Sequence, residues 1–320
     1  MGEPARFIIS LDCEGKWGMA DNLKPYHHEY LTDAALARAY ERLVRLLGGY
    51  QVPATFAFVM AFVLTPEERE QFSSDLVGDD PDPWLLAYRE QTKSGHSQGW
   101  HVPAALDIVR AATPSHEIAC HSFCHRPLGD RSISAGGANA ELGAAKAVGR
   151  LKSLSLETFV FPRNEVGHLA ELRAHGFIGY RERLRRPKGR LGRALSLAEE
   201  LNLWAPSQQQ STIADGIVPI PSGRFLNWRF GARSLVPTIA TVRRWRHQLR
   251  DAVANGGVVH LWLHPHNLIT APATESLLQR VLAEVADMRD SGQLRIVTQR
   301  DYCRETIGRA PSPPDLGYGR

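Results

Sequence analysis

The chain has 320 residues, of which 43% are hydrophobic and 22% are charged, and its formal net charge at pH 7 is +4. This composition is typical of a globular protein with a sizeable core, so it excludes a disordered chain, a collagen and a small disulfide scaffold. The excess of 38 Lys and Arg over 34 Asp and Glu is too small to indicate nucleic-acid binding.

The four cysteines are too few for a disulfide framework and favour a reducing compartment. The N-terminal apolar run is shorter than the core of a secretory signal. The uncharged segment 50–66 is shorter than the ~20 residues that a membrane span needs. We therefore expect a soluble cytoplasmic protein with no membrane span.

Eight short runs rich in apolar, β-branched or aromatic residues predict β-strands. In chain order they are residues 7–11, 54–59, 117–120, 158–161, 177–180, 217–220, 258–263 and 294–297. Stretches with apolar residues at helical spacing lie between most of them, as at Leu36, Tyr40 and Leu43. This alternation predicts βαβ units and the α/β class, with a (β/α) barrel expected and an open doubly wound sheet as the alternative.

We predict one domain over residues 1–309 and a flexible tail over residues 310–320, which is rich in Pro and Gly. The connection over about 61–115 breaks the alternation of strands and helices. A connection of this length is usually a functional insertion. We expect it to overhang the mouth of the barrel.

Ionisable side chains cluster just after four of the predicted strands, where parallel α/β proteins assemble their sites. They are Asp12 and Glu14 after the first strand, His121 and His125 after the third, Arg163 after the fourth, and His264 after the seventh. On the first turn of a helix, the two histidines at i and i+4 would share a face and reach one metal ion. With one carboxylate they make the ligand set of a catalytic zinc site; capping or packed histidines are the alternative.

Two further features bear on this site. Arg163, placed near Asp12, would keep that carboxylate ionised and oriented, although a surface arginine is the alternative. Cys120 and Cys124 interleave with the histidines and allow a structural zinc site, but buried thiols are the favoured interpretation because no second cysteine pair exists.

The basic run 181–190 predicts a solvated face or a contact with an anionic substrate group.

Five motifs resemble, in order and spacing, those of the polysaccharide deacetylases of the NodB-homology, or carbohydrate-esterase, type. They are Asp-Cys-Glu-Gly (12–15), Ala-Thr-Phe (54–56), His-Ser-Phe-Cys-His (121–125), Phe-Pro-Arg-Asn (161–164) and Leu-Trp-Leu-His-Pro (261–265). The resemblance covers about residues 6–300. It implies a distorted, seven-stranded, parallel (β/α) barrel that uses a divalent metal ion to remove acetyl groups from the amide nitrogen of amino sugars.

The resemblance also implies roles for individual residues. Asp12 matches the catalytic base, Glu14, His121 and His125 match the metal ligands, Arg163 matches the arginine that orients the base, and His264 matches the general acid. Asn164 and Trp17 are candidate substrate contacts. Zinc suits the ligand set, with cobalt, nickel, manganese or iron as alternatives.

The sequence departs from the family pattern at three places. Cys13 separates the two acids of the first motif, so the roles of Asp12 and Glu14 could be exchanged. Arg163 follows a proline, whereas the family has Arg-x-Pro-Tyr. The acid and tryptophan that support the general acid in the family are not found near residues 217–222.

The expected substrate is a small acetamido sugar, linked to a nucleotide or a lipid and used in surface-glycan assembly, because a cytoplasmic enzyme would not meet a cell-wall polymer. The oligomeric state is left open. One alternative is an amidohydrolase acting on a non-sugar amide of the purine-catabolite type. Another is a catalytically inactive sugar-binding relative.

Overall fold

The protein is described here by a computed structural model, which covers residues 4–77, 82–184, 195, 198, 213 and 216–309. The predicted tail and most of the basic run, residues 185–190, lie outside these ranges. Within them, nine strands form one sheet in which every pairing is parallel. The strands are β1 (Ala5–Cys13), β2 (Thr55–Phe58), β3 (Glu117–Cys120), β4 (Thr158–Phe159), β5 (Gly179–Arg181), β6 (Val218–Ile220), β7 (Arg224–Phe225), β8 (Val258–Leu263) and β9 (Leu294–Ile296).

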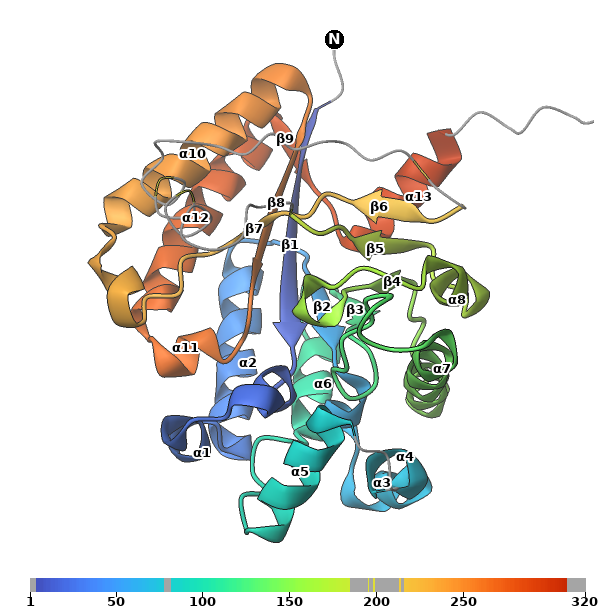
Figure 1. Cartoon of the computed structure of the whole chain (residues 1–320). Helices are drawn as coiled ribbons and strands as arrows, with labels where there is room; N and C mark the ends of the chain where they lie inside the picture. Colours follow the sequence, from blue (N-terminus) through green and yellow to red (C-terminus); the bar gives the residue numbers. More distant parts are fainter. Residues whose placement is uncertain are drawn as a thin grey trace, which may run out of the picture.

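The strand order is β6-β5-β4-β3-β2-β1-β8-β7, and β9 pairs with β1. The sheet curls into a half-barrel, with no described pairing between β6 and β7 (Figure 1). This confirms the distorted parallel (β/α) barrel. The path from β6 to β8 contains seven strands, as expected, and the short β7 and the β9 branch bring the described strands to nine. Each of the eight predicted runs overlaps a strand, whereas the two-residue β7 was not predicted.

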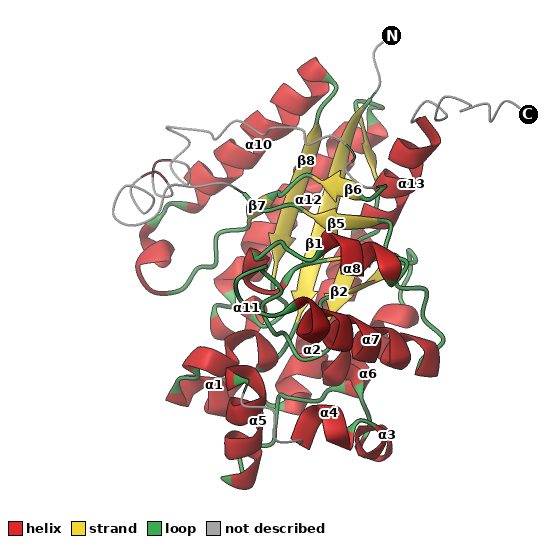
Figure 2. Ribbon diagram, turned by 45° about the vertical axis from the view of Figure 1, so that its right-hand side comes forward, coloured by secondary structure: helices red, strands yellow, loops and turns green. Residues whose placement is uncertain are grey.

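Helices cover the outer face of this sheet, with α10 and α12 beside β8 and with α7 and α8 beside β4 and β5 (Figures 1 and 2). These helices are α2 (Asp33–Gly49), α6 (Pro103–Arg110), α7 (Ala135–Leu151), α8 (Leu169–Ala174), α10 (Thr238–Asn255), α12 (Ala273–Asp290) and α13 (Gln299–Arg309). The helix α2 begins where Thr32 Oγ1 accepts the Ala35 N–H. It buries the predicted apolar face, including Leu36 and Leu43. Within the described ranges, no helix is both long enough and apolar enough to cross a membrane.

Further helices and 3-10 turns, most of them short, gather at the carboxyl end of β1 (Figure 1). These elements are η1 (Trp17–Asn22), α1 (Pro25–Tyr30), η2 (Met60–Val63), α3 (Pro66–Gln71), α4 (Ser73–Val77), α5 (Pro83–Lys93), η3 (Pro162–Asn164), η4 (Gly231–Leu235) and α11 (Asn267–Thr270). The connection over 61–115 supplies α3 to α6, and α5 packs on η1 through Tyr88 and Trp17, whose ring centroids are 4.8 Å apart.

The amino end of the half-barrel is closed by the start of α13. The Gln299 N–H donates to Thr55 Oγ1 at 2.9 Å, and the Arg300 N–H donates to the buried Glu117 carboxylate at 2.9 Å. Glu117 also accepts the hydroxyls of Thr55 and Thr158. A sheet closed at this end leaves the opposite end, where the ionisable clusters lie, as the place for chemistry.

Candidate metal centre and active site

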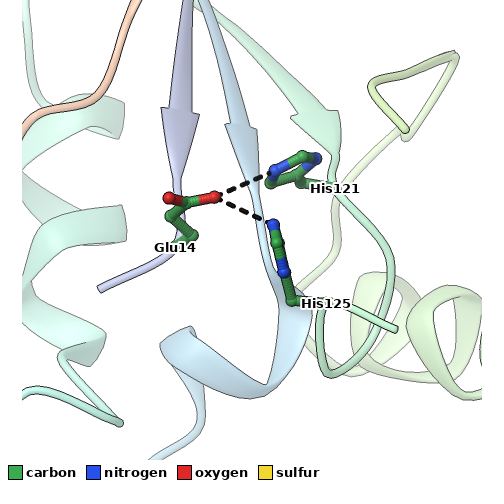
Figure 3. Close-up of side chains that lie close together, drawn as sticks. All are labelled: Glu14, His121 and His125. Atoms are coloured by element: carbon green, nitrogen blue, oxygen red, sulfur yellow. Dashed lines mark hydrogen bonds and ion pairs between the residues drawn. The ribbon is translucent and has the colours of Figure 1, made fainter. Parts of the chain in front are cut away.

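Three buried side chains converge at the carboxyl end of β1 (Figure 3). Glu14 follows β1, and His121 and His125 lie in the loop that follows β3. The Glu14 Oε2 atom lies 3.2 Å from His121 Nε2 and 3.0 Å from His125 Nε2. Their ligand atoms all lie within 4.8 Å of one another, so these residues form a group that could hold a metal ion.

The segment that carries the two histidines is a loop and not the helical turn on which histidines at i and i+4 would share a face. Ser122 and His125 have positive φ angles, 68° and 66°, which a helix does not allow. The loop keeps this shape because Glu141 of α7 accepts the N–H groups of Phe123 and Cys124 at 3.0 and 2.7 Å. The loop therefore brings the imidazoles together by another route than helical spacing.

The cysteines beside the histidines are buried free thiols, as predicted. Cys124 Sγ lies 3.3 Å from Glu141, and burial raises the pKa of this thiol well above its usual value. Burial likewise raises the pKa of Cys120 to about 12. A metal ligand must be a thiolate, so these values favour a thiol that packs over one that binds metal.

The hydrogen bonds of His121 test whether these residues fit a metal ion. Its Nδ1 lies 2.7 Å from the Val160 carbonyl, which can only accept, so Nδ1 carries the proton. A neutral His121 then presents the Nε2 lone pair to a carboxylate oxygen of Glu14. Two acceptors that face each other need a cation between them. Two imidazoles and one carboxylate are the donor set that suits zinc, so the residues fit.

Electrostatics keep this group in the form that binds metal. Burial alone would raise the pKa of Glu14, but the adjacent His264 and His125 outweigh it and hold that pKa well below its usual range. Burial lowers the pKa of His125, despite the opposing attraction of Glu14. Glu14 is therefore ionised, and His125 loses its proton more readily than a solvated histidine.

Asp12, the last but one residue of β1, is paired with Arg181, the last residue of β5. Arg181 donates from Nη1 to Asp12 Oδ1 and from Nη2 to Oδ2, both at 2.7 Å, and both side chains are almost fully buried. Burial alone would raise the pKa of Asp12, but the charge and hydrogen bonds of Arg181 bring it below its usual value. Asp12 is thus held ionised and oriented, as a general base requires.

The expected contact between Arg163 and Asp12 is not made. Arg163, on an exposed turn with a φ of 56°, forms an ion pair with Asp21 and lies 5.6 Å from the Trp84 ring. The place beside Asp12 is taken by Arg181, whose strand lies across the half-barrel. This corrects the role given to Arg163.

The Arg181 guanidinium is itself held by a network of hydrogen bonds. Nη2 donates to Asn164 Oδ1 at 3.1 Å, and Nη1 donates to Ser10 Oγ at 3.3 Å. His260 Nδ1 lies 2.6 Å from the Pro221 carbonyl and therefore carries the proton, so Ser10 donates its hydroxyl hydrogen to His260 Nε2 at 2.8 Å. Asn164 thus contacts the arginine of the site; its predicted contact with substrate stays a prediction.

Trp17, expected as a substrate contact, is a core residue. It is fully buried, and its indole N–H donates to the Trp100 carbonyl at 2.7 Å. The indole of Trp84 contacts His125 Nδ1 at 3.2 Å and the Trp17 carbonyl at 3.1 Å. Trp17 is therefore a packing residue between η1 and the 61–115 connection, which corrects its expected role.

His264 lies at the carboxyl end of β8 and joins the same cluster. Its Nε2 lies 3.4 Å from Glu14 Oε1 and 4.0 Å from Asp12 Oδ2. The Asn267 Oδ1 atom accepts the His264 backbone N–H at 3.1 Å and lies 3.4 Å from Nδ1. The neighbouring His266 is also buried, and its burial lowers its pKa to about 3.

Sequence reasoning missed Arg181, Asn267 and Glu141. Arg181 was counted in the basic run 181–190, although it directly follows the predicted strand 177–180 and so obeys the same strand-end rule as Asp12. Asn267 lies three residues after His264 and supports it where the expected acid and tryptophan were not found. The sequence carries no signal that marks Glu141, because single acidic residues are common on surface helices.

No protein-family model matches the sequence, and no curated protein is similar to it at the sequence level. Solved structures are similar to it in fold. One, from Mycobacterium smegmatis, is assigned to the polysaccharide deacetylases; it is 15% identical, with a TM-score of 0.55 over 100% of this chain and 96% of that one. Another assigned to the same group, from Pseudomonas aeruginosa PAO1, is 12% identical, with a TM-score of 0.51 over 96% and 92%.

The allantoinase PuuE is 13% identical, with a TM-score of 0.54 over 96% of this chain and 92% of that one. At sequence identities this low, the structural similarity establishes a shared fold and nothing more, so the chemistry has to be argued from the site. The likeness extends over nearly the whole described chain. The chain has the fold of the NodB-type polysaccharide deacetylases.

Proposed function

We propose that the protein is a metal-dependent hydrolase that removes an acetyl group from the amide nitrogen of an amino sugar. One observation carries this proposal: Asp12, whose carboxylate is fixed by Arg181, lies close to His264 and to a Glu-His-His group. That group consists of Glu14, His121 and His125. The cluster combines a base, a ligand set for a Lewis acid and a candidate acid within one buried end of the half-barrel. Amide hydrolysis needs these three functions.

Glu14, His121 and His125 would hold the divalent ion, and Zn²⁺ suits them best. A divalent ion held there supplies Lewis acidity for the acyl carbonyl and the attacking water. Asp12 accepts a proton from that water, and it can do so because Arg181 keeps it ionised and fixes both of its oxygens. Hydrogen bonding to both oxygens also restricts the base to one orientation.

His264 is proposed as the general acid. An amide anion is a very poor leaving group, so the leaving nitrogen must receive a proton as the bond breaks. His264 Nε2 lies near Asp12 Oδ2 and near Glu14 Oε1, whereas His121 and His125 contact the other oxygen of Glu14, Oε2. General acid or base assistance of this kind contributes about 10²–10⁴-fold.

Aromatic rings beside the site support a sugar substrate. Phe230 stacks on Trp228 with centroids 4.6 Å apart, and Tyr26 lies 5.5 Å from Phe230. The Trp228 N–H donates to Thr270 Oγ1, which in turn donates to the His266 carbonyl. Flat aromatic surfaces pack well against the C–H face of a sugar ring. We propose a nucleotide- or lipid-linked acetamido sugar of surface-glycan assembly, met in the cytoplasm.

A second candidate is hydrolysis of a ring amide, favoured by the fold shared with the allantoinase. The same base, acid and ligand set would serve it. Acetate release distinguishes the two, because opening of a ring amide frees no acetate.

The test begins with protein stripped of metal by a chelator and reloaded with Zn²⁺, Co²⁺, Ni²⁺, Mn²⁺ or Fe²⁺. Acetate release is measured on nucleotide-linked and lipid-linked acetamido sugars, and ring opening on allantoin. We expect metal-dependent acetate release from at least one sugar, and loss of both bound metal and activity in His121→Ala. Ring opening without acetate release would favour the second candidate. Stoichiometric metal in His121→Ala would refute the ligand set.

A further inference from the structure

The two carboxylate oxygens of Glu14 face two different pairs of histidines. Oε2 faces His121 and His125, as described above, and Oε1 lies 3.4 Å from His264 Nε2. Glu14, His264 and His266 form a second group whose ligand atoms all lie within 4.8 Å of one another. A carboxylate placed between two such groups can bridge two metal ions.

His266 provides an independent observation at this second group. The residue is 8% exposed, and its Nδ1 has no hydrogen-bond partner among the described residues. Buried polar atoms without partners are rare in folded proteins, and one of their explanations is an ion that is not present. The His266 ring stacks on that of His264, with centroids 4.9 Å apart and planes 22° apart, so the two imidazoles are already ordered together.

The same nitrogen of His264, Nε2, would donate the proton in the proposed reaction and would bind the second ion. Asn267 Oδ1 lies nearest His264 Nδ1 and can only accept, so Nδ1 carries a proton in either case. The proton that the leaving amine receives must then come from Nε2. A nitrogen that binds a cation through its lone pair cannot carry a proton.

We propose that Glu14, His264 and His266 bind a second divalent cation, and that this ion inhibits the enzyme by occupying His264 Nε2, the nitrogen that faces Glu14 and Asp12. On binding, a coordinate bond forms from the Nε2 lone pair to the cation, and any proton on that nitrogen goes to solvent. The inhibitory effect rests on the proposed function, whereas the binding of the ion does not.

Charge explains why the second ion binds more weakly than the first. Of the buried charged groups at this end, the two carboxylates Asp12 and Glu14 and the guanidinium of Arg181 belong to the site itself. A first divalent ion at His121 and His125 therefore changes the summed charge of these groups from negative to positive, which repels a second cation. The His264 side chain is 22% exposed, so an ion can reach it from solvent. The second group is thus expected to fill at excess cation.

The test uses Zn²⁺ alone as the probe and the whole chain. Wild type and His266→Ala are dialysed against increasing ZnCl₂, bound zinc is measured by elemental analysis, and acetate release is measured at each concentration. We expect wild type to bind a second equivalent as activity falls. His266→Ala should bind one equivalent and keep its activity at excess zinc.

Two controls make the result specific. His247→Ala removes an exposed histidine on α10 and should behave as wild type, which separates the proposed group from binding at surface histidines. His266→Gln repeats the test if His266→Ala does not fold. One equivalent in wild type at every concentration, or a second equivalent retained in the His266 variants, would overturn the proposal. If no substrate releases acetate, the zinc stoichiometry still decides whether the second group binds.

Discussion

Asp12 and Arg181, 169 positions apart in the chain, form a buried ion pair in which each carboxylate oxygen accepts one guanidinium N–H at 2.7 Å. The pair joins the central strand β1 to β5, four strands away in the sheet order. Buried ion pairs add little net stability, but breaking one leaves an uncompensated charge. This pair therefore sets the charge state of the proposed base.

Replacing Arg181 by Met should move the acid limb of the activity profile to higher pH. Arg181 lowers the pKa of Asp12 against the effect of burial, so its removal raises that pKa and the base becomes protonated at a higher pH. The pH dependence of kcat/KM checks this expectation. Arg181→Lys, which keeps the charge without the paired contacts, should shift the limb less; an unchanged limb in Arg181→Met would argue against the pairing.

The same substitution should cost stability in a pH-dependent way. At neutral pH the variant buries an unpaired carboxylate, at an expected cost of about 3–5 kcal/mol in the free energy of unfolding. In Arg181→Met burial raises the pKa of Asp12 above the unfolded value of ~3.9, so the carboxyl is protonated at about pH 4 and the cost of burying an unpaired charge is lost. The native pair loses its own contribution only at lower pH, as pH falls from ~3.9 through the lower folded pKa. Urea denaturation at neutral pH and at about pH 4 should therefore show a smaller difference at the acidic pH.

Arg163→Ala should leave acetate release close to the wild-type rate. Arg163 pairs with Asp21 on the surface, where both side chains are more than a third exposed, and it does not contact Asp12. Exposed pairs of this kind contribute about 0–1 kcal/mol. Steady-state kinetics of the purified variant check this, and a loss as large as that of Arg181→Met would restore Arg163 as the orienting residue.

His264→Gln should remove the proposed general acid and leave the metal ligands of the first group intact. We expect kcat to fall about 10²–10⁴-fold, because the leaving amine no longer receives a proton from a positioned acid. The first equivalent of zinc should remain bound, since Glu14, His121 and His125 are unchanged. Elemental analysis at stoichiometric zinc, together with kcat, tests both halves; loss of that first equivalent would place His264 among its ligands.

Glu141→Gln should weaken metal binding without touching a ligand. Glu141 accepts the N–H groups of Phe123 and Cys124 and so holds the loop between the two histidines. Loss of outer partners of this kind typically costs 10–100-fold in metal affinity, and we expect an effect of about that size. Competition with a chelator measures the affinity. Arg181→Lys, which lies outside this loop, is the comparison, and equal affinities in Glu141→Gln and wild type would contradict the positioning role.

Much of the fold and of the site could be inferred from the chain alone. Alternating apolar runs and helical faces predict a parallel sheet, and the carboxyl ends of parallel strands lie at the same edge. That rule is sufficient to bring Asp12, Glu14, His121 and His264 to one end of the sheet, because they lie at or just after the ends of β1, β3 and β8. His125 lies five residues beyond β3 and is placed by the loop. The rule depends only on local pattern, which a single sequence displays.

The tertiary structure alone decided that Arg181 rather than Arg163 reaches Asp12, the proposed base, and that Trp17 is buried. The curl of the sheet brings β5 across the interior to β1, so Arg181 meets Asp12 while the tight turn after β4 points Arg163 toward Asp21. Packing of α5 on η1 buries Trp17, and the loop after β8 sets His266 beside His264. The contacts of Arg181, Arg163 and Trp17 join residues far apart in sequence through curvature and packing, and no local periodicity encodes them.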